Sequence, residues 1–182
     1  TYKNGVYRYN PSTKTFTHLN ESLGLSHPEV LKIFKDSKQN MWVGTGNGVN
    51  LWQADEQKFI SFQSNKKKSD SLLGNIVQDI HQSGNGNVWI ATQKGLNLYL
   101  PETKTFKHFD KNNGLPTSLI RAIADDKSGH LWLTTNKGIS RLDPLSGEVT
   151  NFDSYNGLLG MNYYPNSLVK GANETFFTSS QR

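Results

Sequence analysis

The hydrophobic positions of this chain fall into short runs that are separated by polar turns. In the stretch 118–152, apolar runs occupy 118–123, 130–134, 139–142 and 148–152, and Gly, Pro, Asn or Asp stands between them. Runs of about five residues that are rich in Val, Ile, Thr and aromatic side chains are typical of β-strands. No segment keeps the period of an amphipathic helix. The pattern therefore predicts an all-β chain.

The same arrangement recurs along the chain and is marked by a tryptophan. Trp42, Trp89 and Trp132 each follow a polar turn, at spacings of 47 and 43 residues. A fourth, altered copy places Phe176 where the tryptophan would stand, 44 residues after Trp132. Each tryptophan phrase leads into a glycine in the same register: Gly48, Gly95 and Gly138. Because these seven residues recur from unit to unit, we interpret them as structural residues of the repeat.

Four strands in a unit of forty-odd residues are typical of a β-propeller blade. One four-stranded sheet cannot bury both of its faces, whereas consecutive blades around an axis can. Helical arrays and leucine-rich solenoids need helices or a shorter period. The sequence therefore predicts a partial β-propeller domain over residues 1–182, with about four four-stranded blades. By phase, the repeats are approximately 1–44, 45–91, 92–134 and 135–182.

The composition argues against several classes of protein. The hydrophobic content is 34% and cysteine is absent, while the mean hydropathy is −0.64. We expect no membrane span, no disulfide framework and no cysteine-based zinc site. The formal net charge is +5, but apart from Lys66–Lys68 the basic residues are spread through the turns. Basic residues interleaved with stacking aromatics are missing, so we expect no nucleic-acid partner.

The third unit carries a resemblance to a known family. The string from Asn113-Gly-Leu-Pro116 to Arg141-Leu-Asp-Pro144 resembles the two-component regulator propeller repeat. Asp36 aligns with Asp126 in this pattern, and Ser83 replaces the aspartate in the unit between them. The resemblance covers essentially the whole chain. Such repeats occur in the periplasmic sensor region of hybrid two-component system histidine kinases and in related propeller-containing diguanylate cyclases.

The resemblance implies a place in a receptor. Residues 155–165 are similar to the element that marks the final blade of such propellers, which implies a fragment of a larger, usually seven-bladed propeller. The partners implied are the remaining blades, a following β-sandwich module and a second copy in a homodimeric receptor. The function implied is extracytoplasmic, periplasmic ligand sensing by a transmembrane receptor, with an oligosaccharide or another small ligand. No cofactor is implied, and the ligand and the output module stay open.

Candidate binding residues come from the runs and loops that this topology places at the axis. We expect the run before each Asp turn to be the innermost strand, and the loops that feed these strands to cluster at one mouth, where binding sites are common. Aromatic rings at a mouth offer stacking area and a phenol hydrogen bond. The candidate ligand-binding residues are Tyr163, Tyr164, Asn162, Arg121, Gln78, Lys32 and His27. Core packing of one tyrosine and an empty, hydrated channel are the alternatives.

Other motifs carry weaker signals. The longer spacing, from Trp42 to Trp89, reflects four extra residues within Ser64–Ser71, and such insertions often mark a binding face. The lysines there suit an anionic glycan, a protein partner or simply water. The histidines show no metal-ligand spacing, and Asp110–Gly114 lacks the acidic twelfth position of a calcium loop.

The sequence does not predict an enzyme. A propeller glycosidase or lyase needs paired carboxylates at a mouth, and only Glu29 and Asp79 are near. A protein-interaction or dimerisation scaffold without a small ligand is the alternative function, since a partial propeller leaves two strand edges open to pairing.

Overall fold

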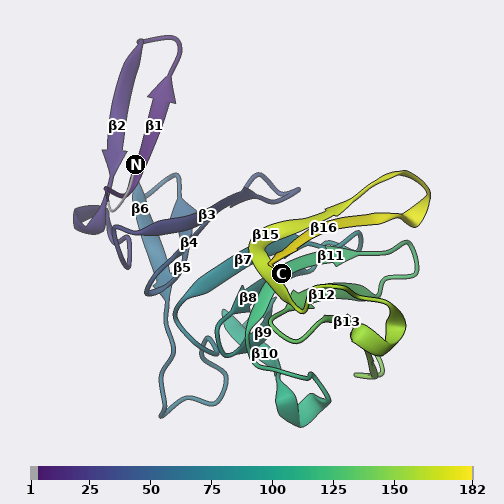
Figure 1. The fold of residues 1–182 in the computed structure, drawn as a ribbon. Helices are drawn as coiled ribbons and strands as arrows, with labels where there is room; N and C mark the ends of the chain where they lie inside the picture. The colour runs from purple at the N-terminus through teal and green to yellow at the C-terminus, as the bar shows by residue number, and fades with distance from the viewer. Residues whose placement is uncertain (1–3, 182) are drawn as a thin grey trace.

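The computed structural model describes residues 4–181, and all regular structure in that range is β-strand or single-turn 3₁₀ helix. The predicted all-β class is therefore confirmed. The strands form five antiparallel sheets, three with four strands and two with two. Figure 1 shows these sheets side by side along the chain, with the first hairpin projecting from the rest.

The three complete blades share one order, in which each strand hydrogen-bonds to the next in sequence. The first blade contains β3 (Val30–Lys35), β4 (Met41–Thr45), β5 (Gly48–Gln53) and β6 (Lys58–Phe62). The second contains β7 (Val77–Gln82), β8 (Val88–Thr92), β9 (Gly95–Leu100) and β10 (Thr105–Phe109). The third contains β11 (Ile120–Asp125), β12 (Leu131–Thr135), β13 (Ile139–Leu142) and β14 (Val149–Phe152).

Two half-blades flank the complete ones. The N-terminal half-blade is β1 (Val6–Asn10) with β2 (Thr15–Leu19), and the C-terminal half-blade is β15 (Asn162–Lys170) with β16 (Phe176–Gln181). Gly5 stands directly before β1, in the repeat position of Gly48 at the start of β5, so the N-terminal half corresponds to the two outer strands of a blade. The C-terminal half corresponds to the two inner strands. The strand total is that of four blades, divided into three complete blades and two complementary halves.

Sheets and sequence repeats are out of phase. Each complete sheet lies within 30–62, 77–109 or 120–152. A unit counted from one tryptophan to the next therefore holds the later strands of one sheet and the first strands of the following sheet. The outermost unit limits, residues 1 and 182, lie outside the described residues.

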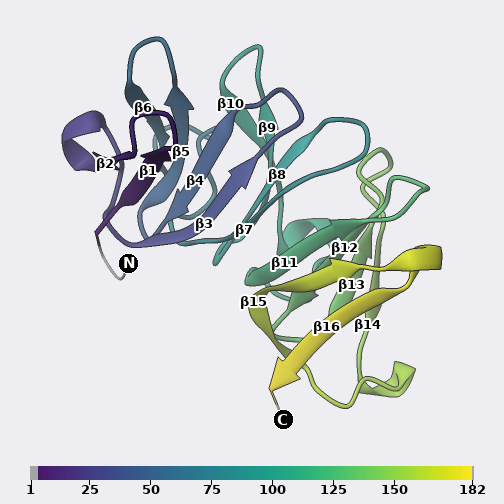
Figure 2. The same ribbon diagram turned by 90° about the horizontal axis from the view of Figure 1, so that it is seen from above.

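The sheets form an arc with their first strands on its inner side. Figure 2 shows β3, β7, β11 and β15 along this side, with β6, β10 and β14 at the outer rim. The strand β7 contacts both β3 and β11, and β11 contacts β15. The prediction that the run before each Asp turn is innermost is therefore confirmed.

The hydrophobic cores lie between consecutive sheets. Between the first and second blades, for example, Trp42 and Val49 pack with Val77 and Ile80. Trp42 and its equivalent in the second blade are 1% and 0% exposed. Trp132 keeps some exposure, because the C-terminal half-blade covers it with the single ring of Phe176, 5.2 Å away between centroids. Each blade thus buries its faces only against its neighbours.

Each tryptophan also fixes the turn that precedes its strand. The indole N–H of Trp42 donates to Asp36 Oδ2 at 2.9 Å, and that of Trp132 donates to Asp126 Oδ2 at 3.1 Å. Burial alone would raise the pKa of these two carboxyls. The hydrogen bonds from the tryptophan and from neighbouring groups outweigh it, so both pKa values are lowered from their usual range. Serine stands at this position in the second blade and accepts from the indole through its hydroxyl at 3.1 Å.

The glycine after each tryptophan phrase is required by the turn. Gly138 has φ = +102°, and a Cβ there would lie 2.2 Å from the carbonyl oxygen of Phe152 on the neighbouring strand. Gly48 and Gly95 also have positive φ and backbone oxygens within 3 Å of the same hypothetical atom. Both the backbone conformation and the close approach therefore exclude a side chain.

The links between sheets contain short 3₁₀ turns, except before the second blade. These are η1 (Glu21–Leu23), η2 (Lys111–Asn113) and η3 (Ser154–Asn156), while η4 (Ala172–Glu174) lies in the β15–β16 turn. The first three share an Asn or Asp cap and end at a glycine with φ near +90°. Before the second blade, the insertion Ser64–Ser71 takes their place.

Candidate functional site

A one-residue bulge interrupts the pairing near the start of β3, β7 and β11. The pairing register shifts by one residue between Val30 and Lys32 and at the equivalent places in β7 and β11. Bulges re-aim a side chain relative to the sheet. The residues at the bulge are Leu31, Gln78 and Arg121. Two of the candidate residues thus occupy one structural position in neighbouring blades, and Arg121 Nη1 donates to Gln78 Oε1 at 3.1 Å.

Lys32 occupies the next position and has a different partner. Its Nζ lies 2.7 Å from Asp79 Oδ1, an ion pair between the first and second blades. Lys32 therefore lies on an inner strand, as predicted, but one position after the bulge, where its equivalents are Asp79 and Ala122. Because of the bulge and of the insertion between the first two units, the sequence alone does not show which residues are structurally equivalent.

Asp79 connects three blades. Its Oδ1 also accepts from its neighbour's amide, Ile80 N, at 2.8 Å, and its Oδ2 accepts from Ile123 N of the third blade at 2.9 Å. The residue is 4% exposed. The carboxylate considered above for glycan chemistry is therefore occupied by one ammonium and two backbone amides. Sequence analysis missed this role because a backbone donor 44 residues away leaves no side-chain signal.

Arg121 retains an unused donor beside Gln78. Its Nε is buried and has no hydrogen-bond partner among the described residues, although the residue as a whole is partly exposed. A buried donor without an acceptor costs about 1–3 kcal/mol. The Nε atom is closed to solvent, but the side chain as a whole is partly exposed, and a guanidinium carries five N–H donors, so its other N–H groups can bind a carboxylate or a hydroxyl.

The mouth loops are tied to each other and to the neighbouring turns. His27 Nδ1 accepts from Glu29 N at 3.1 Å, so one ring nitrogen of this candidate is already bonded. Its ring packs close to Gly46, where an added Cβ would lie 3.2 Å from Nδ1. Asn75 donates to Asn47 Oδ1 of the preceding blade at 2.9 Å. These contacts make the mouth a pre-formed surface.

The two tyrosines of β15 have different environments. Tyr163 is 5% exposed and its burial raises the pKa of the phenol, whereas Tyr164 is 47% exposed. The register of β15 shifts between Tyr163 and Leu168, and Asn166 adopts φ = +55° within this wide bulge. Tyr163 therefore presents no free face for stacking, while Tyr164 does. Asn162 precedes them and is partly buried.

The histidines of the outer strands hold the backbone. Nε2 of His18 lies 2.7 Å from Asn4 O, and Nε2 of His108 lies 2.6 Å from Ser71 O. Within residues 4–181, no group of three or more His, Asp or Glu side chains is placed to hold a metal ion. Asp110, the first residue of the weak calcium-loop pattern, caps η2.

A repeated contact at the opposite end of the blades escaped sequence analysis. There, a side chain of one blade accepts from a backbone amide in the β-turn of the preceding blade. The pairs are Ser37 N with Gln82 Oε1 at 2.7 Å, Gly84 N with Asp125 Oδ2 at 2.8 Å, and Lys127 N with Glu174 Oε2 at 2.8 Å. The amides recur at the repeat spacing, but the acceptors are Gln, Asp and Glu, so their sequence signal is weak.

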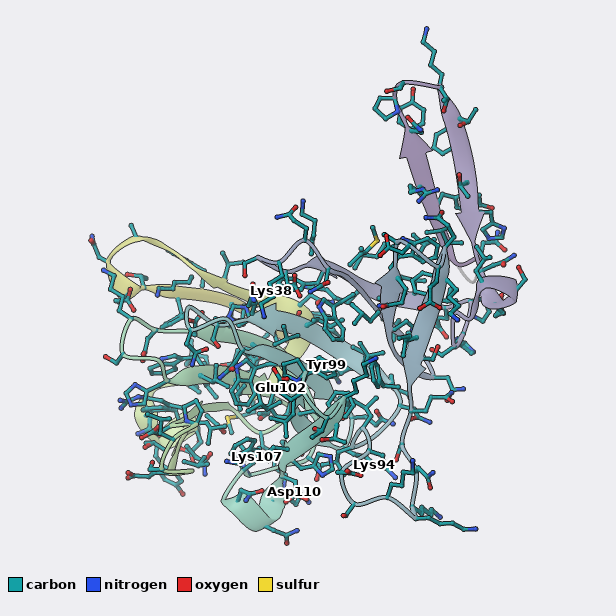
Figure 3. The ribbon with its side chains drawn as sticks, turned by 180° about the vertical axis from the view of Figure 1, so that it is seen from behind. Lys38, Lys94, Tyr99, Glu102, Lys107 and Asp110 are labelled. Carbon is teal, nitrogen blue, oxygen red and sulfur yellow. The ribbon has the colours of Figure 1, made fainter. Side chains whose placement is uncertain are left out.

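A hollow of about 360 Å³ lies at the same end, between the first and second blades. Its lining includes Lys38, Trp42 and Leu51 from the first blade and Val88 and Tyr99 from the second. Figure 3 labels Lys38 and Tyr99. Burial raises the pKa of the Tyr99 phenol. Trp42, Val88 and Tyr99 belong to the hydrophobic core between the first two blades, so the hollow is a place where that core reaches the surface.

Comparison with known sequences identifies the repeated segments. Residues 24–47, 71–94 and 114–137 match the two component regulator propeller family. Each match begins in or beside the link that precedes an inner strand and ends at the turn after the tryptophan strand. The resemblance inferred from the tryptophan phrase is therefore confirmed. No curated protein matches the chain.

Solved structures with the same fold include two from one organism. The extracellular domain of the hybrid two component system BT3049 from B. thetaiotaomicron is 28% identical, with a TM-score of 0.82 over 97% of this chain and 24% of that chain. The extracellular domain of BT4673 from the same organism is 20% identical, with a TM-score of 0.80 over 98% of this chain and 26% of that chain. The chain thus spans about a quarter of the length of these structures.

A third structure shares the fold alone. A virginiamycin B lyase from Staphylococcus aureus is 17% identical, with a TM-score of 0.63 over 84% of this chain and 49% of that chain. In residues 4–181 no helix has the length and apolar character that crossing a membrane would need.

Proposed function

Because this chain is built from two component regulator propeller repeats, we propose that it is the ligand-sensing propeller segment of a transmembrane receptor, placed on the periplasmic side. The likeness to extracellular domains of hybrid two component systems supports this assignment. The parent receptor would carry a histidine kinase output, and the segment itself would perform no chemistry. A non-catalytic role is supported by Asp79, because its carboxylate is already bonded to Lys32 and to the amides of Ile80 and Ile123.

The observation that carries the proposal is the pair at the bulge position. Arg121 and Gln78 come from adjacent blades and meet at 3.1 Å, and both side chains stay partly exposed. Guanidinium and amide groups recognise hydroxyl and carboxylate oxygens. An oligosaccharide that enters the mouth would meet these groups, with the exposed Tyr164 available for stacking.

A ligand bound at this position would signal by shifting the population of conformations of the propeller. The bulge position is formed by two blades, so a ligand that bridges them favours one relative arrangement of those blades. In the parent receptor this preference would pass to the remaining blades, to a β-sandwich module and to the geometry of a homodimer.

Calorimetry with a panel of neutral and acidic oligosaccharides tests the proposal. We expect one class to bind, and Arg121→Ala and Gln78→Ala to weaken that binding at least tenfold. Tyr155→Ala is the matched control, because Tyr155 is 97% exposed in η3, at the end of its link next to the outermost strand β14. Equal affinity of the wild type and the two mouth variants would refute binding at this position.

A second function is favoured by the half-blades. They expose large apolar side chains, among them Phe16 at 70%, Val169 at 62% and Phe177 at 63%. Such surfaces mark interaction sites. An interaction or dimerisation scaffold without a small ligand would use them, and it predicts normal signalling by receptors that carry Arg121→Ala.

A further inference from the structure

The insertion in the second unit builds a groove at the outer rim, away from the axial site. The groove has a volume of about 460 Å³ and lies between β6 and β10. Volumes of about 300–1,000 Å³ are usual for small-molecule sites. Ser64–Ser71 is the only link between complete blades in residues 4–181 that lacks a 3₁₀ turn, and it forms one wall of this groove.

The inserted loop is held by a dense set of hydrogen bonds. Asn65 N donates to Ser71 Oγ at 2.9 Å, and that hydroxyl lies 2.8 Å from Lys68 O. Two bonds join the loop to residues outside it: Ser64 N donates to Asn75 Oδ1 at 2.7 Å, and Phe106 N donates to Asp70 O at 2.8 Å. Both ends of the loop are therefore anchored, and the groove wall has a defined shape.

The bond from Phe106 N narrows the choice of occupant. Phe106 lies in β10, the outermost strand of the second blade, whose free edge would otherwise accept an added strand. With this amide bonded to Asp70 O, the edge is closed to an extended peptide at this point. The groove therefore suits a compact ligand better than a strand.

The lining combines apolar side chains with charged and polar walls. Phe62, Leu72 and Phe106 are the apolar lining residues, and Phe62 is the one of the three that is not buried. Lys68 of the loop and Lys104 of the β9–β10 turn supply ammonium groups from two segments, and Asp70 is the one carboxylate among the lining residues. Amide and hydroxyl groups complete the walls: Gln63, Asn65, Ser61, Ser71, Thr103 and Thr105.

The charges beside the groove are mixed. Lys66 and Lys67 add positive charge on the same loop, and both are exposed. Glu102, labelled in Figure 3, precedes the lining residues of the β9–β10 turn. The lining has an excess of one positive charge, which the neighbouring lysines increase.

We infer that this groove is a second binding site, for an acidic sugar unit whose carboxylate pairs with Lys68 and Lys104. The hydroxyls of such a unit would bond to the amide and hydroxyl groups of the walls, and its apolar face would lie on Phe62. The site is separate from Arg121 and Gln78, so either site can exist without the other.

Titration of the 182-residue chain with a hyaluronan tetrasaccharide, which alternates uronate and N-acetylhexosamine units, tests this inference by calorimetry. We expect binding that Lys68→Ala and Lys104→Ala each weaken at least fivefold, and that Arg121→Ala leaves unchanged. The neutral cellotetraose should bind at least tenfold more weakly. Circular dichroism of each variant checks the fold, which these surface changes should preserve.

Lys66→Ala and Lys67→Ala provide the matched control. They remove the same charge from the same loop without touching the groove lining. If they weaken binding as much as Lys68→Ala, the lysines act only as a diffuse positive field and the groove site is refuted. Absence of tetrasaccharide binding refutes it as well, whereas loss through Arg121→Ala alone assigns the ligand to the axial site.

Discussion

Replacement of Asp79 should destabilise the arc of blades more than any exposed acidic substitution. In Asp79→Ala, Ile80 N and Ile123 N lose their acceptor and Lys32 loses its counter-ion. Removing one member of a buried ion pair costs about 3–5 kcal/mol, and an unsatisfied buried amide costs about 1–3 kcal/mol. The Lys32 side chain is 26% exposed and regains some hydration, which reduces the sum.

We therefore expect Asp79→Ala to lower the free energy of unfolding by about 3–4 kcal/mol. For a domain of this size, each kcal/mol lowers the melting temperature by about 2–4 °C. Urea unfolding at pH 7, followed by tryptophan fluorescence, measures the effect. Asp55→Ala in an exposed turn is the control, and it should change stability by less than about 0.5 kcal/mol.

A double-mutant cycle separates the ion pair from the backbone contacts. Lys32→Met and Asp79→Asn, alone and together, should give a coupling energy of at least about 1 kcal/mol. An Asp79→Ala protein within about 1 kcal/mol of wild type would refute the reasoning. Zero coupling would show that Lys32 and Asp79 do not stabilise each other, even if Asp79→Ala is destabilising.

Three further predictions concern the repeat itself. The pKa of Asp36 is lowered in the folded state, so its contribution to folding stability is complete above about pH 4 and is lost as the pH falls through the folded pKa. In urea titrations, the stability difference between wild type and Asp36→Asn should therefore shrink from pH 7 to pH 3. A difference that stays constant over this range would count against the prediction. Gly138→Ala places Cβ 2.2 Å from Phe152 O, whereas Gly129→Ala, also at positive φ, meets nothing within 4 Å. Thermal unfolding should therefore show about 2 kcal/mol more destabilisation for Gly138→Ala than for Gly129→Ala. Equal destabilisation by the two substitutions would show that the close contact with Phe152 has no effect. Light scattering of the isolated chain should give a mass above that of the 20.5 kDa monomer, because Phe16, Val169 and Phe177 of the half-blades are exposed and open strand edges favour pairing. A monomer at all concentrations would contradict this.

The repeat could be predicted because it rests on local patterns. Each strand and turn is encoded within a few residues, and the spacing of Trp42, Trp89 and Trp132 sets the unit. The division of the strands into sheets could not be predicted in this way. The repeat spacing shows where each unit recurs, but it does not show which consecutive strands are not hydrogen-bonded to each other. The two half-blades follow from that pairing.

The site was harder to predict because its contacts join different units. Asp79 reads as a free carboxylate in the sequence, yet it meets Lys32 and Ile123, which are 47 and 44 residues away. The bulges also interrupt the alternation of inward and outward side chains. For that reason the sequence could not say which of Tyr163 and Tyr164 is buried.

The offset between sheets and sequence units bears on how such arrays change length in evolution. A duplicated segment that runs from one tryptophan to the next brings the closing strands of one sheet and the opening strands of another. Its ends find partners in sheets that already exist, so the array grows by one blade and every complete sheet keeps four strands. A duplication in phase with the sheets would instead add a free-standing blade, joined to its neighbours through side chains alone.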